Sequence, residues 1–231
     1  MKYLIINTKK YFDNEQFSRF IVNFNEYLND DKIILACDKL HYDLIYNNSI
    51  NLCFQSFDDF NSFSKEKTNI KYSLIGHKDD RFYKNENNFL INERIKNLLK
   101  NDIIPILCVG EEIYEENLQK TLSTIFVQID ECMKDLSSKT VEKILLAYAP
   151  IWAISDGRSF VDVDIFRIND IIKEIKKKIK DKYSINPIVL YGGSINDKNI
   201  AQINTLEIEG LLIGAASTDK DILNKIFHSI T

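Results

Sequence analysis

The chain has 231 residues, 45% of them hydrophobic, which is enough to bury one sizeable core, so we expect a single domain over residues 1–231. Its 30 basic and 34 acidic residues give a net charge of -4, which leaves no broad positive surface for nucleic acid or an anionic membrane. The apolar runs are too short for a signal peptide or a membrane span, so we expect a cytoplasmic protein.

Short apolar and β-branched runs recur along the chain and are typical of strands buried on both faces. In chain order they are Tyr3 to Ile6, Ile33 to Cys37, Leu52 to Phe54, Tyr72 to Ile75, Ile103 to Val109, Ile144 to Tyr148, Ile188 to Tyr191 and Leu211 to Ile213. Amphipathic helical patterns lie between them. Clear examples are Phe17, Phe20, Ile21, Phe24 and Leu28, and Ile168, Ile171, Ile172, Ile175 and Ile179.

Alternating strands and helices fit either an open, doubly wound sheet or a closed barrel. The two glycine-rich nucleotide-loop motifs that are usual in open sheets, G-x-G-x-x-G and G-x-x-x-x-G-K-[ST], are absent from the sequence. We therefore favour an α/β fold of the (β/α)8 barrel type.

Polar or small residues follow five of the predicted strands, where a barrel of this type places its active site. These segments are Asn7 to Lys9, Gly76 to Asp79, Ala149 to Trp152, Gly192 to Ser194 and Gly214 to Ser217. The last two are rich in small residues, which let backbone N–H groups converge on an anion. They predict a small phosphorylated substrate.

Single residues at these strand ends are weaker evidence for a functional site than the two clusters of small residues. A lone histidine such as His77 is more often structural than catalytic, and Lys9 alone reads as a surface charge. Together at one barrel mouth, they could stabilise a developing oxyanion. The four cysteines have no C-x-x-C spacing, so we expect reduced core thiols, no metal site and no cofactor.

Four motifs carry a family resemblance: G-H-x-[DE] at Gly76 to Asp79, P-I-L-C-V-G-E at Pro105 to Glu111, A-Y-x-P-I-W-A-I at Ala147 to Ile154, and Y-G-G-S at Tyr191 to Ser194. In order and spacing they resemble the triosephosphate isomerases, over essentially the whole chain. The resemblance implies a TIM barrel. It also implies interconversion of dihydroxyacetone phosphate and glyceraldehyde 3-phosphate, an intramolecular redox reaction of glycolysis and gluconeogenesis.

Triosephosphate isomerase is a standard example of proton-transfer catalysis: a glutamate moves the proton, a neutral histidine polarises the carbonyl, and a lysine stabilises the enediolate as a lid closes. The resemblance assigns the histidine role to His77 and the lysine role to Lys9, with Asn7 as their polar neighbour. It assigns phosphate binding to the backbone groups of Ser155, Ser194, Gly214 and Ala215. It assigns the lid to Pro150, Ile151, Trp152, Ala153, Ile154, Asp156, Gly157 and Arg158.

The sequence departs from the family at the base, because Ala149 stands where the family has its catalytic glutamate. A methyl group accepts no proton, so we expect turnover to be severely reduced or absent while phosphate binding survives. Asp79 also replaces a glutamate that is one methylene longer. A further hypothesis is that Asp79 or Asp156 has taken over as the base.

The segment from Gln55 to Tyr72 is several residues shorter than the family's third loop, which in the family inserts into a partner subunit. A monomer and a weakened homodimer therefore both stay open. Two functions stay open as well: an isomerase that has lost its base, and a non-catalytic barrel that binds a small phosphorylated metabolite or a protein partner.

Overall fold

Eight parallel strands close into a barrel in a computed structural model of the protein, which describes residues 2–45, 49–61, 70–154 and 160–230. Each strand pairs with the next, and β1 pairs with β8 to complete the ring. The strands are β1 (Tyr3–Lys9), β2 (Ile33–Cys37), β3 (Asn51–Phe54), β4 (Ile70–Ile75), β5 (Ile104–Val109), β6 (Leu145–Tyr148), β7 (Ile188–Tyr191) and β8 (Gly210–Ile213). The predicted (β/α)8 barrel is confirmed, and the open sheet is excluded.

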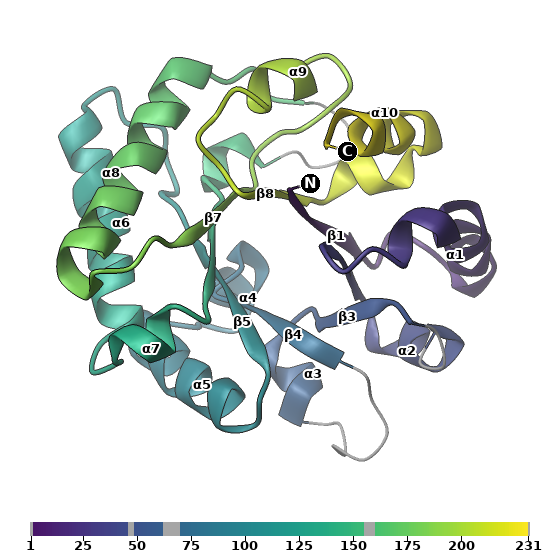
Figure 1. Ribbon diagram of the computed structural model, residues 1–231, viewed down its shortest axis with the longest axis horizontal. Coiled ribbons are helices and arrows are strands. Elements are labelled where there is room, and N and C mark those ends of the chain that lie inside the picture. Colours follow the sequence, from purple (N-terminus) through teal and green to yellow (C-terminus); the bar gives the residue numbers. More distant parts are fainter. Residues whose placement is uncertain (1, 46–48, 62–69, 155–159, 231) are drawn as a thin grey trace.

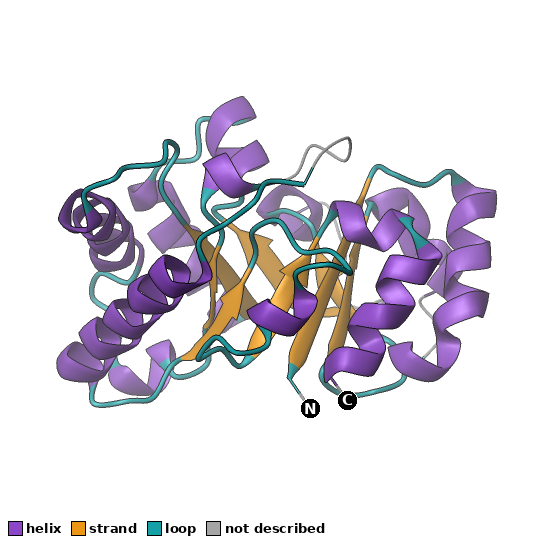
Figure 2. Ribbon diagram, turned by 90° about the horizontal axis from the view of Figure 1, so that it is seen from above, coloured by secondary structure: helices purple, strands orange, loops and turns teal. Residues whose placement is uncertain are grey.

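Helices cover the outside of the ring, and the two termini lie close together at one end of the barrel (Figure 1, Figure 2). The α-helices are α1 (Asn14–Leu28), α2 (Lys39–Ile45), α3 (Phe57–Asn61), α4 (Lys78–Tyr83), α5 (Asn88–Lys100), α6 (Leu118–Cys132), α7 (Ser138–Val141), α8 (Ile165–Tyr183), α9 (Ile200–Ile203) and α10 (Lys220–Ile230). Two 3-10 turns, η2 (Ile151–Ala153) and η3 (Ala215–Thr218), follow β6 and β8 directly.

The alternation of side chains along each strand divides the core into two parts. Ile5 belongs to a smaller cluster that also contains Ile34, Leu74 and Leu212, whereas its neighbours Leu4 and Ile6 belong to a larger one shared with the helices. Because both faces of every strand are covered, the strands appear in the sequence as continuous apolar runs.

The helical periodicity is also confirmed. The predicted apolar stripes of α1 and α8 are buried at every position named in the sequence analysis. In α1, Asp13 caps the N-terminus by accepting from the N–H of Gln16 at 2.8 Å, while Gln16 reaches back to the N–H of Asp13 at 3.0 Å. Within the described part of the chain, no helix is long and apolar enough to cross a membrane.

Candidate active site

A pocket opens at the mouth of the barrel, meaning the end at which the strands finish. It brings together residues from the ends of five strands, namely Asn7 and Lys9 in the last part of β1, His77 after β4, Ala149 after β6, Gly192 and Gly193 after β7, and Gly214 and Ala215 after β8. The rule that parallel strands gather their carboxyl ends at one face accounts for this convergence.

The end of β1 is bent to present Lys9. The pairing of β1 with β2 shifts register between Asn7 and Lys9, and Lys9 has a φ of 47°. A left-handed backbone costs a residue with a side chain about 1–2 kcal/mol, so the surroundings must hold it in place. The buried amide of Asn7 does so, because its Oδ1 accepts from the N–H of Lys9 at 3.2 Å and from Nε2 of Gln55 at 3.0 Å.

The end of β4 is fixed just as firmly. Gly76 has a φ of 68°, which a glycine adopts without strain. Its N–H donates to Oε2 of Glu86 at 3.0 Å, and its carbonyl accepts from Nε of Arg81 at 2.9 Å. Two charged side chains thus hold the peptide groups that precede His77.

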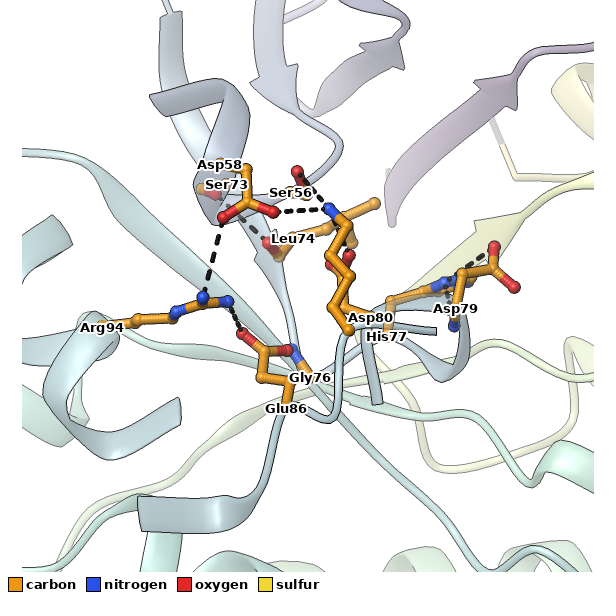
Figure 3. Close-up of polar contacts among 11 residues, drawn as sticks. Ser56, Asp58, Ser73, Leu74, Gly76, His77, Asp79, Asp80, Glu86 and Arg94 are labelled. Atoms are coloured by element: carbon orange, nitrogen blue, oxygen red, sulfur yellow. Dashed lines mark hydrogen bonds and ion pairs between the residues drawn. The ribbon is translucent and has the colours of Figure 1, made fainter. Parts of the chain in front are cut away.

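Figure 3 shows that the support behind Gly76 extends further, because Glu86 lies between Gly76 and Arg94. The side chain of Glu86 is 1% exposed and pairs with Arg94. Burial raises the pKa of Glu86, and Arg94 opposes that rise. Nearby, Lys84 bridges Asp58 and Asp80, with 2.8 Å between its Nζ and a carboxylate oxygen of each.

His77 caps the N-terminus of α4. Its Nδ1 accepts from the backbone N–H of Asp79 at 3.3 Å, and the same nitrogen lies 3.4 Å from Oδ2 of Asp79. Nδ1 can make only one of these hydrogen bonds at a time: without a hydrogen it accepts from the backbone, and with one it donates to the carboxylate. When Nδ1 of a neutral ring accepts from the backbone, the ring hydrogen is on Nε2.

Asp79 is also paired with Lys9, with 3.4 Å between Nζ and Oδ2. The pKa of Asp79 is held well below its ordinary value, first by its contact with His77 and then by the charge of Lys9. The carboxylate is therefore ionised and engaged with both residues.

Ala149 follows β6 with its methyl group facing the β7 side of the pocket. A Cβ added to Gly192 would lie 3.2 Å from the Cβ of Ala149. The backbone here is well anchored, since the N–H of Ala149 donates to the carbonyl of Val109 at 2.8 Å and the N–H of Gly192 to that of Tyr148 at 2.9 Å.

The first part of the predicted lid is described from Pro150 to Ile154. Trp152 donates from Nε1 to Oε1 of the buried Glu111 at 2.7 Å, and the hydroxyl of Tyr148 lies 3.1 Å from the same oxygen. The rest of the predicted lid, Asp156, Gly157 and Arg158, lies outside the described residues, as does Ser155, which was assigned to phosphate binding.

Of the other three predicted phosphate-binding residues, two line the pocket and one does not. Gly214 and Ala215 line the pocket, with a φ of -112° at Gly214, and Ala215 is the first residue of η3. Ser194 is 1% exposed and is not among the residues lining the pocket. Its Oγ accepts from the backbone N–H of Val161 at 2.9 Å. The side chain of Ser194 thus ties the segment after the lid to β7.

Sequence reasoning missed three residues that position the site: Gln55, Arg81 and Glu86. Gln55 directly follows β3, so the rule of inspecting every strand end would have found it. Arg81 and Glu86 lie in a polar stretch around α4, where no local pattern separates them from solvated charges.

The fold and the pocket define a (β/α)8 barrel protein whose candidate active site lies at the carboxyl ends of its strands. A sequence profile of the triosephosphate isomerase family matches residues 2–230. A triosephosphate isomerase of Blochmanniella floridana is 34% identical over 226 residues, covering 90% of this chain and 85% of the relative. The chain belongs to the triosephosphate isomerase family.

Other family members match a shorter segment. The triosephosphate isomerase of Mesomycoplasma hyorhinis is 35% identical over 68% of this chain, and that of Dictyoglomus thermophilum is 38% identical over 64%. Both of these alignments span 61% of the relative's length.

Proposed function

We propose that the mouth of this barrel binds a triose phosphate, and that loss of the base at position 149 leaves its isomerisation severely reduced or absent. The observation that carries the proposal is the arrangement of Lys9, His77 and Ala149 around one pocket. The chain keeps a cation and a hydrogen-bond donor but presents a methyl group at the family's base position.

The chemistry explains why this one position matters. Interconversion of the two triose phosphates removes a proton from the carbon beside the carbonyl and returns it to the neighbouring carbon. Lys9 and the Nε2–H of His77 can stabilise the negative charge that develops on oxygen, but neither accepts the carbon-bound proton. General-base catalysis contributes about 10²- to 10⁴-fold, and that contribution is missing here.

The first prediction concerns Ala149→Glu in a coupled isomerase assay. We expect the variant to exceed the unmodified chain by at least about 10²-fold in kcat, because one carboxylate restores the proton carrier. Ala149→Gln is the matched control, since it has the same size without a basic oxygen. If Glu and Gln variants are equally silent while folded, the isomerase proposal fails.

A non-catalytic role is the second candidate, in which the barrel binds a small phosphorylated metabolite or a protein partner. Ala149 itself favours it, since a binding site needs no proton carrier. In that case the Glu variant stays inactive, and titration with glycerol 3-phosphate separates the two ligand classes. Binding supports a metabolite, whereas no binding at millimolar concentration supports a protein partner.

We also propose a cytoplasmic protein that is monomeric or forms a weakened homodimer. The short segment between Gln55 and Tyr72 supports this proposal, although residues 62–69 lie outside the described residues. Sedimentation equilibrium over a range of protein concentrations measures the dissociation constant directly.

A further inference from the structure

The outer side of α8 presents one line of exposed residues. The line consists of Phe166, Asp170, Lys173, Lys177 and Lys180. Their alternating spacing of four and three residues places them on one side of the helix, opposite the buried side. Because each residue of a helix rises by about 1.5 Å, the line is about 21 Å long.

The two ends of this line differ in character. At the N-terminal end, Phe166 is 85% exposed, and the exposed side chains of Asp162, Asp164 and Asp170 lie on either side of it in the sequence. At the C-terminal end, residues 176–182 include five lysines and one aspartate. An identical helix that lay antiparallel to this one would meet the opposite charge at both ends.

A groove between α6 and α8 lies beside the basic end, where the two helices are side by side (Figure 1). Its volume is about 430 Å³, and it is lined by Phe126 of α6 and by Glu174, Lys177, Lys178, Asp181 and Lys182 of α8. A cavity of about 150 Å³ already holds a benzene ring, so the groove has room for an apolar side chain of another molecule.

The loop before α6 lies at the acidic end, on the same side of α8 as the groove. Arg167 holds it there, because its guanidinium donates to the carbonyl of Glu116 at 3.0 Å and to Oγ1 of Thr121 in α6 at 3.1 Å. The loop exposes two apolar side chains, Ile113 at 71% and Tyr114 at 45%. Such projecting apolar groups are typical of surfaces that bind another protein.

We infer that this surface binds a second copy of the chain, with the two α8 helices antiparallel about a two-fold axis near Lys173. In this arrangement the acidic end of one copy meets the groove at the basic end of the other, and the symmetry makes every contact twice. Asp170 faces Lys177 of the second copy, because these residues lie at equal distances on either side of the axis. Ile113 and Phe166 approach the groove.

The charged residues on this line are available for such contacts. Among the described residues, no ion pair engages Asp170, Lys177 or Lys180. Lys173, which approaches its own counterpart at the axis, is paired with Glu207 at 3.4 Å, and this carboxylate reduces the repulsion between the two lysines. The association therefore depends on charge and weakens as salt is added.

This surface is separate from the shortened third loop. α8 connects β6 with β7, whereas residues 55–69 connect β3 with β4, further around the ring. It is also separate from the candidate ligand pocket, since none of the residues lining that pocket belongs to α8. The inference thus goes beyond the proposed function and does not depend on it.

Sedimentation equilibrium of the unmodified chain, Asp170→Lys and Lys177→Asp tests the inference. Each single reversal places two pairs of like charges in the interface, so we expect the dissociation constant to rise at least about tenfold. An equimolar mixture of the two variants should recover association, because each copy then offers the charge that the other lacks. Glu26→Lys, a reversal at an exposed position of α1, is the control and should leave the dissociation constant unchanged.

The apolar contact has its own pair of variants. Phe166→Ser should weaken the dimer, whereas Val22→Ser, which removes an apolar side chain of similar exposure from α1, should not. Circular dichroism shows whether each variant is folded.

A monomeric unmodified chain at millimolar concentration overturns the inference. A dimer that the single reversals do not weaken also overturns it, as does a mixture that fails to associate. None of these outcomes bears on ligand binding at the barrel mouth, which Ala149→Glu and the glycerol 3-phosphate titration test separately.

Discussion

Asp79 contacts both Lys9 and His77, which makes it the obvious carboxylate to ask about as a replacement base. Its surroundings argue against that role. A carboxylate whose pKa is held well below the ordinary range is a poor proton acceptor, and its charge is already used in holding Lys9. Lys9 has a strained, positive φ, so it also needs partners such as Asp79 that hold it in place. We therefore interpret Asp79 as a residue that positions Lys9 and His77. The other candidate base, Asp156, lies outside the described residues.

His41 yields a prediction of pH dependence. It is 3% exposed and stacks on Phe17, with 4.1 Å between the ring centroids. Burial lowers the pKa of His41, and the charges of Asp38 and Asp13 only partly oppose this. The unfolded chain, with a histidine pKa of about 6.5, therefore takes up the proton first as the pH falls. The contribution of His41 to the free energy of unfolding is fully present above a pH of about 6.5 and declines as the pH falls below it. The decline ends once the pH is below the pKa of His41 in the folded state.

The variant His41→Phe should flatten this decline, because phenylalanine keeps the stacking and carries no proton. Urea unfolding of the variant and of the unmodified chain at pH 7 and pH 5 measures the difference. A decline in His41→Phe as steep as in the unmodified chain contradicts the account.

At the scale of elements, the turn from β4 into α4 depends on a buried ion pair. Glu86→Gln should destabilise the fold by up to about 3 kcal/mol, because it removes the closer of the two carboxylates that pair with the mostly buried Arg94 and leaves only Asp58, at 3.6 Å. The control is Glu93→Gln on α5, the helix that carries Arg94; the pair of Glu93 with Lys96 is exposed and is worth under about 1 kcal/mol. Urea denaturation measures the free energy of unfolding of both variants. Equal losses would show that the buried pair of Glu86 is worth no more than an exposed one.

Prediction from sequence succeeded best for elements with a strong local pattern. The strands were recognisable because both of their faces are buried, and α1 and α8 because one face is. Strand ends were harder: β1 continues through the polar residues to Lys9, and β4 begins at Ile70, before the exposed Lys71. The sequence singled out several residues that line the candidate pocket because polar or small residues stand at the strand ends there. Glu86 could not be found in this way, since it reaches Gly76 only through the path of the folded chain.

Closure of the barrel is a property of the whole molecule, and the four cysteines offer a way to test it. Cys37, Cys53 and Cys108 lie in β2, β3 and β5, Cys132 ends α6, and all four are free and buried. Burial raises the pKa of each thiol, to about 12 for Cys108 and Cys132. The reactive thiolate is therefore scarce in the folded state.

Because β1 pairs with β8, the described barrel has no free strand edge from which a single strand could peel away. We therefore expect dithionitrobenzoate to modify all four thiols in one kinetic phase, at a rate that rises with urea in parallel with global unfolding followed by circular dichroism. Early reaction of Cys132 alone would instead show that α6 opens before the barrel. Early reaction of Cys37 and Cys53 together would show that the β2–β3 sector is a separate unit of lower stability, and the single-unit view of the barrel would then be wrong.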